Sequence, residues 1–291
     1  MFMKGVLMVE ATNNLLLNRV FTRNTFKALI NESRDTSYNA AVVRYVADPE
    51  GKSHQQIISF IYKLMDNEYR NEYYYKNTLL NKLLLGIHSP KTTVALTEVP
   101  VNKSKADFIL INGKAVVYEI KTELDNLDRL ENQLNDYFKA FNNVCVVTSE
   151  ATFEAVNKKL VNSNVGIYVL THRNTISLRK EAVNDASRLD LGIIFKILRK
   201  KEYESIIKEV YGYLPDVSQF KYYSECKKLF ENIDVWTAYT MFIKELKKRN
   251  SIDMELFEKV PKEIKSIIYF SDFNIKDYVN LNRFLQSKYR G

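Results

Sequence analysis

The stretch TEVPVNKSKADFILINGKAVVYEIKTELDNLDRLENQLNDY, residues 97–137, decides the fold of this 291-residue chain. It contains two apolar runs of strand character, residues 106–111 and 115–121, and the pair Asn112-Gly113 stands between them. An Asn-Gly pair between two such runs is a strong short-range signal for a tight hairpin. We therefore expect the two runs to be neighbouring strands of one sheet.

Charged residues stand at the ends of these strands that lie away from the turn. Asp107 opens the first strand, and Glu119 and Lys121 close the second. Because side chains alternate along a strand, Glu119 and Lys121 point to one face and Ile120 to the other. A two-residue turn with a regular ladder would place Asp107 on the face opposite Glu119. A shared site therefore requires a three-residue turn or a bulge near Asp107.

These residue types together fit a metal site that acts on phosphodiesters. Hard divalent cations such as Mg²⁺ and Mn²⁺ prefer carboxylate and carbonyl oxygens, which Asp107, Glu119 and the main-chain carbonyl of Ile120 would supply. A bound cation activates water and offsets charge on the phosphate. Lys121 would orient the attacking water or stabilise the transition state. We expect Mg²⁺- or Mn²⁺-dependent phosphodiester hydrolysis.

Two further acids are candidates for the same metal. Glu98 interrupts the apolar strand run 93–100 without a packing benefit, and we expect it to be a metal ligand. Glu72 lies on the preceding helix, where it also fits a solvent-exposed position at a polar helix start. We therefore rank Glu98 above Glu72.

A helix is expected after the second strand, over residues 124–141. Its apolar stripe consists of Leu127, Leu130, Leu134, Phe138 and Phe141, at helical spacing. A polar row beside the stripe consists of Asp125, Arg129, Gln133 and Tyr137. Asp125 and Arg129 fit equally an ordinary (i, i+4) pair or a role in the site, whereas Gln133 and Tyr137 favour the site.

The arrangement of an Asp at a strand start, a hairpin, and Glu119-Ile120-Lys121 at the end of the next strand resembles the PD-(D/E)XK nuclease superfamily, whose motif ends in E-x-K. Ala106 stands where the name of the motif has proline. A longer pattern is similar to a largely uncharacterised bacterial family of RecB-like nucleases; it consists of Glu98, Ala106-Asp107, Tyr118-Glu119-Ile120-Lys121, Asp125, Arg129-Leu130, Gln133 and Tyr137. The resemblance covers roughly residues 70–175.

This resemblance implies a restriction-endonuclease-like mixed sheet with the order helix, three strands, helix, strand. It implies catalytic roles for Asp107, Glu119 and Lys121. In RecB-type members, a Q-x-x-x-Y pair on the helix after the catalytic strand shapes the site and the nucleic-acid groove. Gln133 and Tyr137 match that pair.

The rest of the chain is consistent with an α/β (α+β) fold. Strands are expected at residues 93–100, 106–111, 115–121, 144–149 and 166–171. Helices are expected at residues 68–86, ended by Gly86, and at 151–162. We expect three segments: an N-terminal helical segment (1–66), the nuclease-like domain (67–184) and a helical C-terminal domain (185–291).

A net charge of +8 and a pI near 9.1 suit a polyanionic partner. The run Lys247-Lys248-Arg249 lies on an expected helix, and with Arg129 it is a candidate set of phosphate contacts. The alternative for such a run is a solvated helix face. We expect nucleic acid as partner, DNA rather than RNA, and allow for a protein partner at the helical C-terminal domain.

Other residue types exclude several classes of protein. Two cysteines, Cys145 and Cys226, are too few for a disulfide framework, a zinc site or a four-cysteine iron–sulfur cluster. The three histidines, His54, His88 and His172, are widely separated, and we expect surface or loop positions rather than metal ligation. No apolar run is long enough to span a bilayer, so a cytoplasmic location without membrane contact is expected.

The sequence therefore predicts a metal-dependent nuclease. One alternative is a catalytically silent member of the same fold that binds nucleic acid or regulates a partner, although the intact set of Asp107, Glu119 and Lys121 argues against it. Another alternative is a toxin or defence effector that a partner activates. The sequence does not separate this effector from a stand-alone nuclease.

Overall fold

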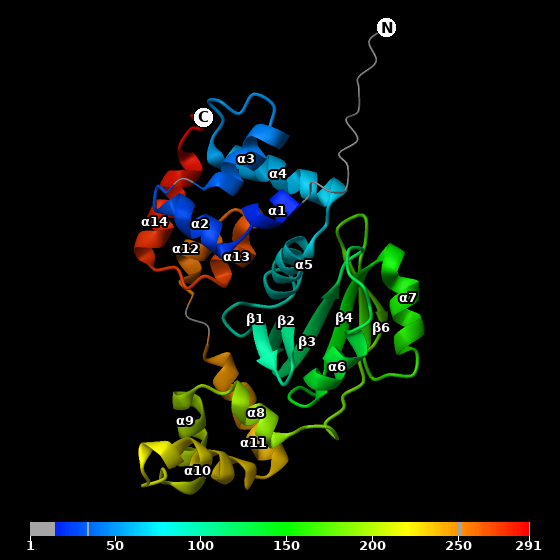
Figure 1. The fold of residues 1–291 in the computed structure, drawn as a ribbon, viewed down its shortest axis with the longest axis vertical. Coiled ribbons are helices and arrows are strands. Elements are labelled where there is room, and N and C mark those ends of the chain that lie inside the picture. Colours follow the sequence, from blue (N-terminus) through cyan, green and yellow to red (C-terminus); the bar gives the residue numbers. More distant parts are fainter. Residues whose placement is uncertain (1–14, 34, 250–251, 291) are drawn as a thin grey trace. The chain divides into compact units, whose positions relative to one another are not determined.

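The computed structural model describes residues 15–33, 35–249 and 252–290 (Figure 1). Contacts divide the chain into two compact units. Residues 78–251 form one, called here the sheet unit. Residues 1–77 and 252–291 form the other, called the helical unit. None of the helices in the described ranges is long and apolar enough to cross a membrane.

The sheet unit is built on one six-stranded mixed sheet. Its strands are β1 (Val94–Val101), β2 (Ser104–Asn112), β3 (Lys114–Lys121), β4 (Val144–Ser149), β5 (Gly166–Leu170) and β6 (Ile176–Lys180), in that spatial order. The first three strands form an antiparallel meander, β3, β4 and β5 run parallel, and β6 returns antiparallel to β5. The expected mixed α/β class is confirmed in this coarse form. The edge strand β6 was not expected.

Helices connect and cover these strands. Within the sheet unit they are α6 (Leu130–Phe138), α7 (Glu150–Leu160), α8 (Leu191–Ile197), α9 (Lys200–Tyr211), α10 (Gln219–Glu231) and α11 (Val235–Lys247). Helix α6 links β3 to β4 and packs on β2 and β4, and α7 links β4 to β5 and packs on both (Figure 1). Each parallel pair of strands is thus joined by a crossover helix, as parallel pairing requires.

The turn between β2 and β3 has three residues. Asn112 pairs with Lys114 and Ile111 with Ala115, which leaves Gly113 at the tip with φ +70°. Glycine takes this left-handed conformation without the penalty that a Cβ brings. The pairing continues to Phe108 and Tyr118. The three-residue turn that a shared site requires is thus present, and Asp107 lies one residue before the last pair of this ladder.

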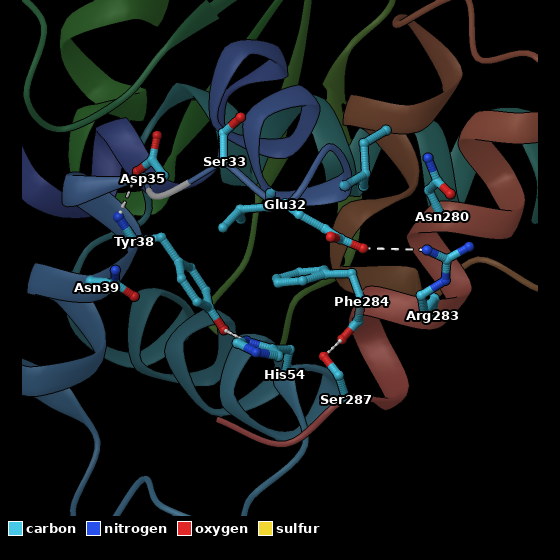
Figure 2. Close-up of a pocket in the computed structure, with 12 residues that line it drawn as sticks. Glu32, Ser33, Asp35, Tyr38, Asn39, His54, Asn280, Arg283, Phe284 and Ser287 are labelled. Carbon is cyan, nitrogen blue, oxygen red and sulfur yellow. Dashed lines mark hydrogen bonds and ion pairs between the residues drawn. The ribbon is translucent and has the colours of Figure 1, made fainter. Parts of the chain in front are cut away.

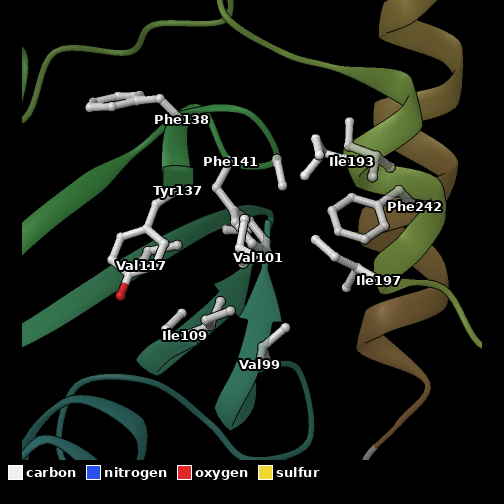
Figure 3. Close-up of a cluster of buried hydrophobic side chains, with 14 of the residues drawn as sticks. Val99, Val101, Ile109, Val117, Tyr137, Phe138, Phe141, Ile193, Ile197 and Phe242 are labelled. Atoms are coloured by element: carbon white, nitrogen blue, oxygen red, sulfur yellow. The ribbon is translucent and has the colours of Figure 1, made fainter. Parts of the chain in front are cut away.

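The core of the sheet unit includes the segment after the last strand. Val101 of β1, Phe141 after α6, Ile193 of α8 and Phe242 of α11 belong to one buried cluster (Figure 3). The rings of Phe141 and Phe242 lie 5.6 Å apart. Burying this apolar face against the sheet stabilises both parts together. The expected break after residue 184 is therefore not where the two units divide.

The helical unit takes its helices from both ends of the chain. They are α1 (Leu15–Val20), α2 (Arg23–Ile30), α3 (Thr36–Tyr45), α4 (His54–Glu68), α12 (Met254–Glu258), α13 (Lys265–Tyr269) and α14 (Ile275–Gln286). Helix α14 packs on α2 and α4. Residues 252–291 thus belong with the N-terminal helices and not with residues 185–251.

The helix expected over residues 68–86 is divided. Glu68 ends α4, a break follows, and α5 begins at Glu72 and ends at Leu79. A π-helical turn, η2 (Leu80–Leu84), continues it. A Cβ at Gly86 would lie 2.6 Å from the carbonyl oxygen of Lys82, so glycine is required where this segment ends.

Candidate active site

Glu119 and Lys121 form a buried ion pair at the end of β3. Lys121 Nζ donates to Glu119 Oε1 at 2.7 Å, and the two side chains are 11% and 1% exposed, in that order. Strand alternation explains the pair, because residues two apart share a face. Burying two charges is favourable only with good geometry and additional hydrogen bonds. The predicted convergence of the two side chains is confirmed.

Helix α6 supplies those additional hydrogen bonds. Lys121 Nζ also donates to Gln133 Oε1 at 2.9 Å, and the Tyr137 hydroxyl lies 2.6 Å from Glu119 Oε2. Gln133 and Tyr137 stand one helical turn apart, so both reach the end of β3. We call these four side chains, Glu119, Lys121, Gln133 and Tyr137, the buried cluster.

The phenol of Tyr137 is a fixed donor in this cluster. Burial raises its pKa most, and the charge and hydrogen bond of Glu119 and the charge of Asp107 raise it further. The hydrogen bond with Gln133 acts in the opposite direction but does not offset them. The hydroxyl therefore stays protonated, and its proton lies between Glu119 Oε2 at 2.6 Å and the Lys105 carbonyl oxygen at 2.8 Å.

Asp107 directs its carboxylate to the backbone of β3. Its Oδ2 accepts the Ile120 N–H at 2.8 Å, beyond the point where the ladder of β2 and β3 ends. The Thr97 hydroxyl donates to the Asp107 carbonyl oxygen at 2.7 Å, which fixes this residue from β1. Asp107 is half-buried. The Asp107 carboxylate thus accepts the Ile120 N–H near the end of β3, where a backbone carbonyl oxygen would accept it in a continuing ladder.

Glu98 lies beside Asp107 in an unusual backbone conformation. Its φ is +56°, which is rare for a residue with a Cβ. Carboxylate oxygens of Glu98 and Asp107 lie within 4.8 Å of each other. Leu96 and Val99 both pack on the same hydrophobic cluster although they are three residues apart, so β1 changes face at Glu98. An ion pair with Lys105, at 3.2 Å, holds the exposed Glu98 side chain.

The expected helical row that begins at Asp125 is wrong in its first half. Residues 122–129 lie outside helices and strands, and α6 begins only at Leu130. The Asp125 carboxylate accepts the Thr122 N–H at 2.9 Å and the Thr122 hydroxyl at 2.8 Å. Such local hydrogen bonds of Asp compete with helix formation. Arg129 is exposed at the start of α6, where its role toward nucleic acid stays a prediction.

The run Lys247-Lys248-Arg249 is not one solvated face. Arg249 donates to Glu202 Oε1 and Oε2 at 2.7 and 2.6 Å and to the Ile197 carbonyl oxygen at 2.8 Å. Lys248 pairs with Glu245 of its own helix turn. Lys247 is exposed. The expectation for Arg249 is therefore corrected, because its guanidinium is largely buried and engaged with Glu202 and the Ile197 carbonyl oxygen.

His54 occupies a helix and a cavity rather than a surface loop. It begins α4 and lines a cavity of about 340 Å³ in the helical unit, together with Tyr38 and Phe284 (Figure 2). The Tyr38 hydroxyl lies 2.7 Å from His54 Nδ1, and the rings of His54 and Phe284 stack at 4.3 Å. Burial lowers the pKa of His54. The Ser53–Gln56 capping box signals the helix start, but nothing local signals Phe284.

The remaining histidines and the cysteines have no part in the site. His88 is half-buried and His172 is exposed, and both lie outside helices and strands. Both cysteines are buried. Burial raises the pKa of Cys145 to about 12, which suits an inert small hydrophobe.

Comparisons with known proteins show one relationship. The model of a family described as bacteriophage P4 protein cII matches residues 65–269. Protein cII of Enterobacteria phage P4 is 28% identical over 130 residues, which cover 44% of this chain and 48% of that protein. The match thus spans about half the length of that relative. No solved structure matches the chain.

Proposed function

This chain belongs to the bacteriophage P4 protein cII family, and we propose that its sheet unit is a metal-dependent nuclease that acts on DNA. The observation that supports this most is the buried cluster with Asp107 beside it. A purely structural buried ion pair gives little net stability over apolar residues of similar volume. Acids from two strands, a lysine, a glutamine and a tyrosine at one end of a sheet fit phosphodiester chemistry better.

We further propose that the sheet unit is a PD-(D/E)XK fold. The chain order of helix, three antiparallel strands, crossover helix and parallel strand supports this proposal. So does the meeting of the Glu119-Lys121 pair with the Gln133-Tyr137 pair. The restriction-endonuclease-like arrangement is an interpretation of these contacts.

The donor set of the site fits Mg²⁺ or Mn²⁺. Asp107 and Glu98 have carboxylate oxygens within 4.8 Å of each other. Glu119, on the strand next to that of Asp107, is the further proposed ligand, and both its oxygens are hydrogen-bonded inside the buried cluster. Hard divalent cations prefer such oxygens. When bound, the cation supplies an activated water and neutralises charge on the phosphate. The main-chain carbonyl of Ile120 is the remaining proposed ligand.

The residues of the chain divide the other tasks. Lys121 carries the positive charge that would stabilise the transition state, and Gln133 holds its ammonium in place. Tyr137 contacts Glu119 Oε2, while Glu119 Oε1 faces Lys121. A positioned cationic group of this kind lowers the barrier because it offsets charge that develops in the transition state. Exposed cations, among them Arg129 and Lys247, are proposed to contact phosphates.

A second candidate function is a catalytically silent protein that binds nucleic acid or regulates a partner. Both carboxylate oxygens of Glu119 are engaged in hydrogen bonds, and its side chain is 1% exposed. This observation favours a site whose Glu119 carboxylate is not available to a cation. Such a site is equally consistent with a defence or toxin effector in which a partner must first expose that carboxylate. Both alternatives predict no cleavage by the isolated chain.

The test is cleavage of labelled single- and double-stranded DNA and RNA in Mg²⁺, Mn²⁺ or EDTA. Lys121→Ala is compared with Lys114→Ala, which removes an exposed lysine from the other end of the same strand. The proposal expects cleavage that EDTA and Lys121→Ala abolish and that Lys114→Ala preserves. Equal cleavage by both variants would refute the assignment of the site.

A further inference from the structure

Thr148 has a buried hydroxyl without a hydrogen-bond partner in the described part of the chain. The residue lies on β4 and is 0% exposed, and its Oγ1 is among the few buried polar atoms left unsatisfied. The great majority of buried polar groups are paired, so an exception needs an explanation. A valine of the same shape would fill this position without that penalty.

The register places Thr148 beside the buried cluster. In the parallel pairing of β3 and β4, Lys121 is the partner of Thr148, and Glu119 is the partner of Val146. Residues paired in this way lie on the same face of the sheet, on strands about 4.8 Å apart. The unpartnered hydroxyl is therefore on the face of the sheet that carries Glu119 and Lys121.

The donors of Lys121 are not exhausted. A lysine ammonium has three N–H donors. The hydrogen bonds to Glu119 Oε1 and Gln133 Oε1 use two of them. If Glu119 Oε1 binds a cation, the Lys121 ammonium keeps only its hydrogen bond to Gln133. It is then a buried charge with too few hydrogen-bond partners. A nearby acceptor would then be needed to keep the ammonium in place.

We propose that Thr148 is a positioning residue for Lys121, and this rests on the proposed nuclease function. Its hydroxyl accepts a hydrogen bond from the Lys121 ammonium when Glu119 turns its carboxylate toward the cation. The buried Thr148 hydroxyl, which has no other recorded partner, is thus an acceptor available to Lys121. It keeps Lys121 at the strand end instead of letting it follow Glu119.

The test uses Thr148→Val, which deletes the hydroxyl and keeps the shape, and Thr148→Ser, which keeps the hydroxyl. Thr93→Val is the matched control. Thr93 is also fully buried with an unpartnered hydroxyl, but it stands just before β1, at the end of the sheet away from Asp107. Three quantities are measured: the single-turnover rate in Mg²⁺, DNA affinity in Ca²⁺, and Tm with and without Mg²⁺.

The expected rate for Thr148→Val is about 10-fold below wild type, as for loss of one hydrogen bond to a charged group. Its DNA affinity is unchanged, and its Tm without Mg²⁺ is equal to or above that of wild type. Its rise in Tm on adding Mg²⁺ is smaller. Thr148→Ser restores the rate to within about 2-fold. Thr93→Val leaves the rate and the Mg²⁺ effect at the wild-type values.

Opposite outcomes overturn the inference. If wild type cleaves and Thr148→Val cleaves equally fast, Thr148 does not position Lys121, and the proposed function still stands. If Thr148→Val lowers Tm without Mg²⁺, the hydroxyl has a structural partner such as a fixed water. If wild type neither cleaves any substrate nor gains stability from Mg²⁺, the proposed function fails and this inference fails with it.

Discussion

The Tyr137 hydroxyl contacts Glu119 Oε2 at 2.6 Å, although the two residues lie 18 positions apart on a helix and a strand. The contact joins α6 to the end of β3. It also ties the proposed chemistry to the stability of the fold, because the carboxylate that would bind a cation is the one that the helix holds.

Replacing Tyr137 should therefore affect both properties. Tyr137→Phe leaves a buried carboxylate oxygen without its donor, and we expect a loss of about 2 kcal/mol of unfolding free energy. Urea denaturation measures this loss. Tyr118→Phe is the control, since Tyr118 is on the same strand but on the other face, and its loss should stay below about 0.5 kcal/mol. Equal small losses in both variants would contradict a stabilising Tyr137–Glu119 bond.

Local sequence signals predicted which side chains of β3 and α6 meet better than they predicted the bounds of the two units. The Asn112-Gly113 pair, strand alternation and the Gln133-Tyr137 spacing each act within a few residues, and the structure brings those residues together. The ring of Phe284 against His54, and the Arg249–Glu202 pair, join positions 230 and 47 residues apart. Contacts at such separations leave no periodic trace in one sequence.

The prediction of helix bounds failed where apolar helical spacing and a local side-chain hydrogen bond competed. The apolar spacing over residues 124–141 is typical of a helix throughout, yet Asp125 binds Thr122 and delays the helix to Leu130. The edge strand β6 escaped prediction because an edge strand with half-buried and exposed residues gives little alternation. The shared core of the sheet and α11 depends on packing that no single helix pattern reveals.

Glu98 provides a test of backbone strain at the site. A residue with a Cβ in the left-handed region costs about 1–2 kcal/mol, which glycine avoids. We expect Glu98→Gly to be about 1 kcal/mol more stable than Glu98→Ala, because both lose the carboxylate and only alanine keeps the strain. Thermal unfolding of the pair measures the difference. A more stable alanine variant would mean that the backbone changes conformation in solution.

The Mg²⁺ response of the same two variants tests the proposed ligand. Both variants lack the Glu98 carboxylate, so each should gain less stability from Mg²⁺ than wild type does. The ion pair with Lys105 is exposed and contributes little, so its loss does not mask this comparison. Full Mg²⁺ stabilisation in both variants would remove Glu98 from the proposed ligands.

Arg249 should be essential for the fold and unsuited to a test of DNA binding. Arg249→Ala leaves the buried Glu202 unpaired, and we expect a loss of about 3 kcal/mol of unfolding free energy. Lys247→Ala, from the same run, should change stability by less than about 0.5 kcal/mol. It should weaken DNA affinity and flatten the salt dependence if Lys247 contacts a phosphate. A stable Arg249→Ala protein would contradict the structural role.

The same pair predicts a pH dependence. Burial raises the pKa of Glu202, but hydrogen bonds from Arg249 and the Arg199 amide outweigh it, so the pKa lies below its usual value. A lowered pKa contributes stability above the unfolded-state pKa, and this contribution is lost as the pH falls through the folded-state pKa. The stability difference between wild type and Arg249→Ala should therefore shrink below a pH of about 4.5. A difference that stays constant to pH 3 would show that Glu202 is not responsible.

Two variants of Asp107 distinguish a structural hydrogen-bond acceptor from a metal ligand. Asp107→Asn keeps an oxygen for the Ile120 N–H and removes the negative charge beside Glu119, so stability without metal should be kept or increased. Asp107→Ala removes the acceptor as well and should lose about 1–2 kcal/mol. Both variants should lose the stabilisation that Mg²⁺ or Mn²⁺ gives to wild type. Thermal unfolding with and without each cation measures all three effects. An Asp107→Asn protein that is as destabilised as Asp107→Ala would mark Asp107 as a structural residue, and one that retains the full Mg²⁺ response would exclude it as a ligand.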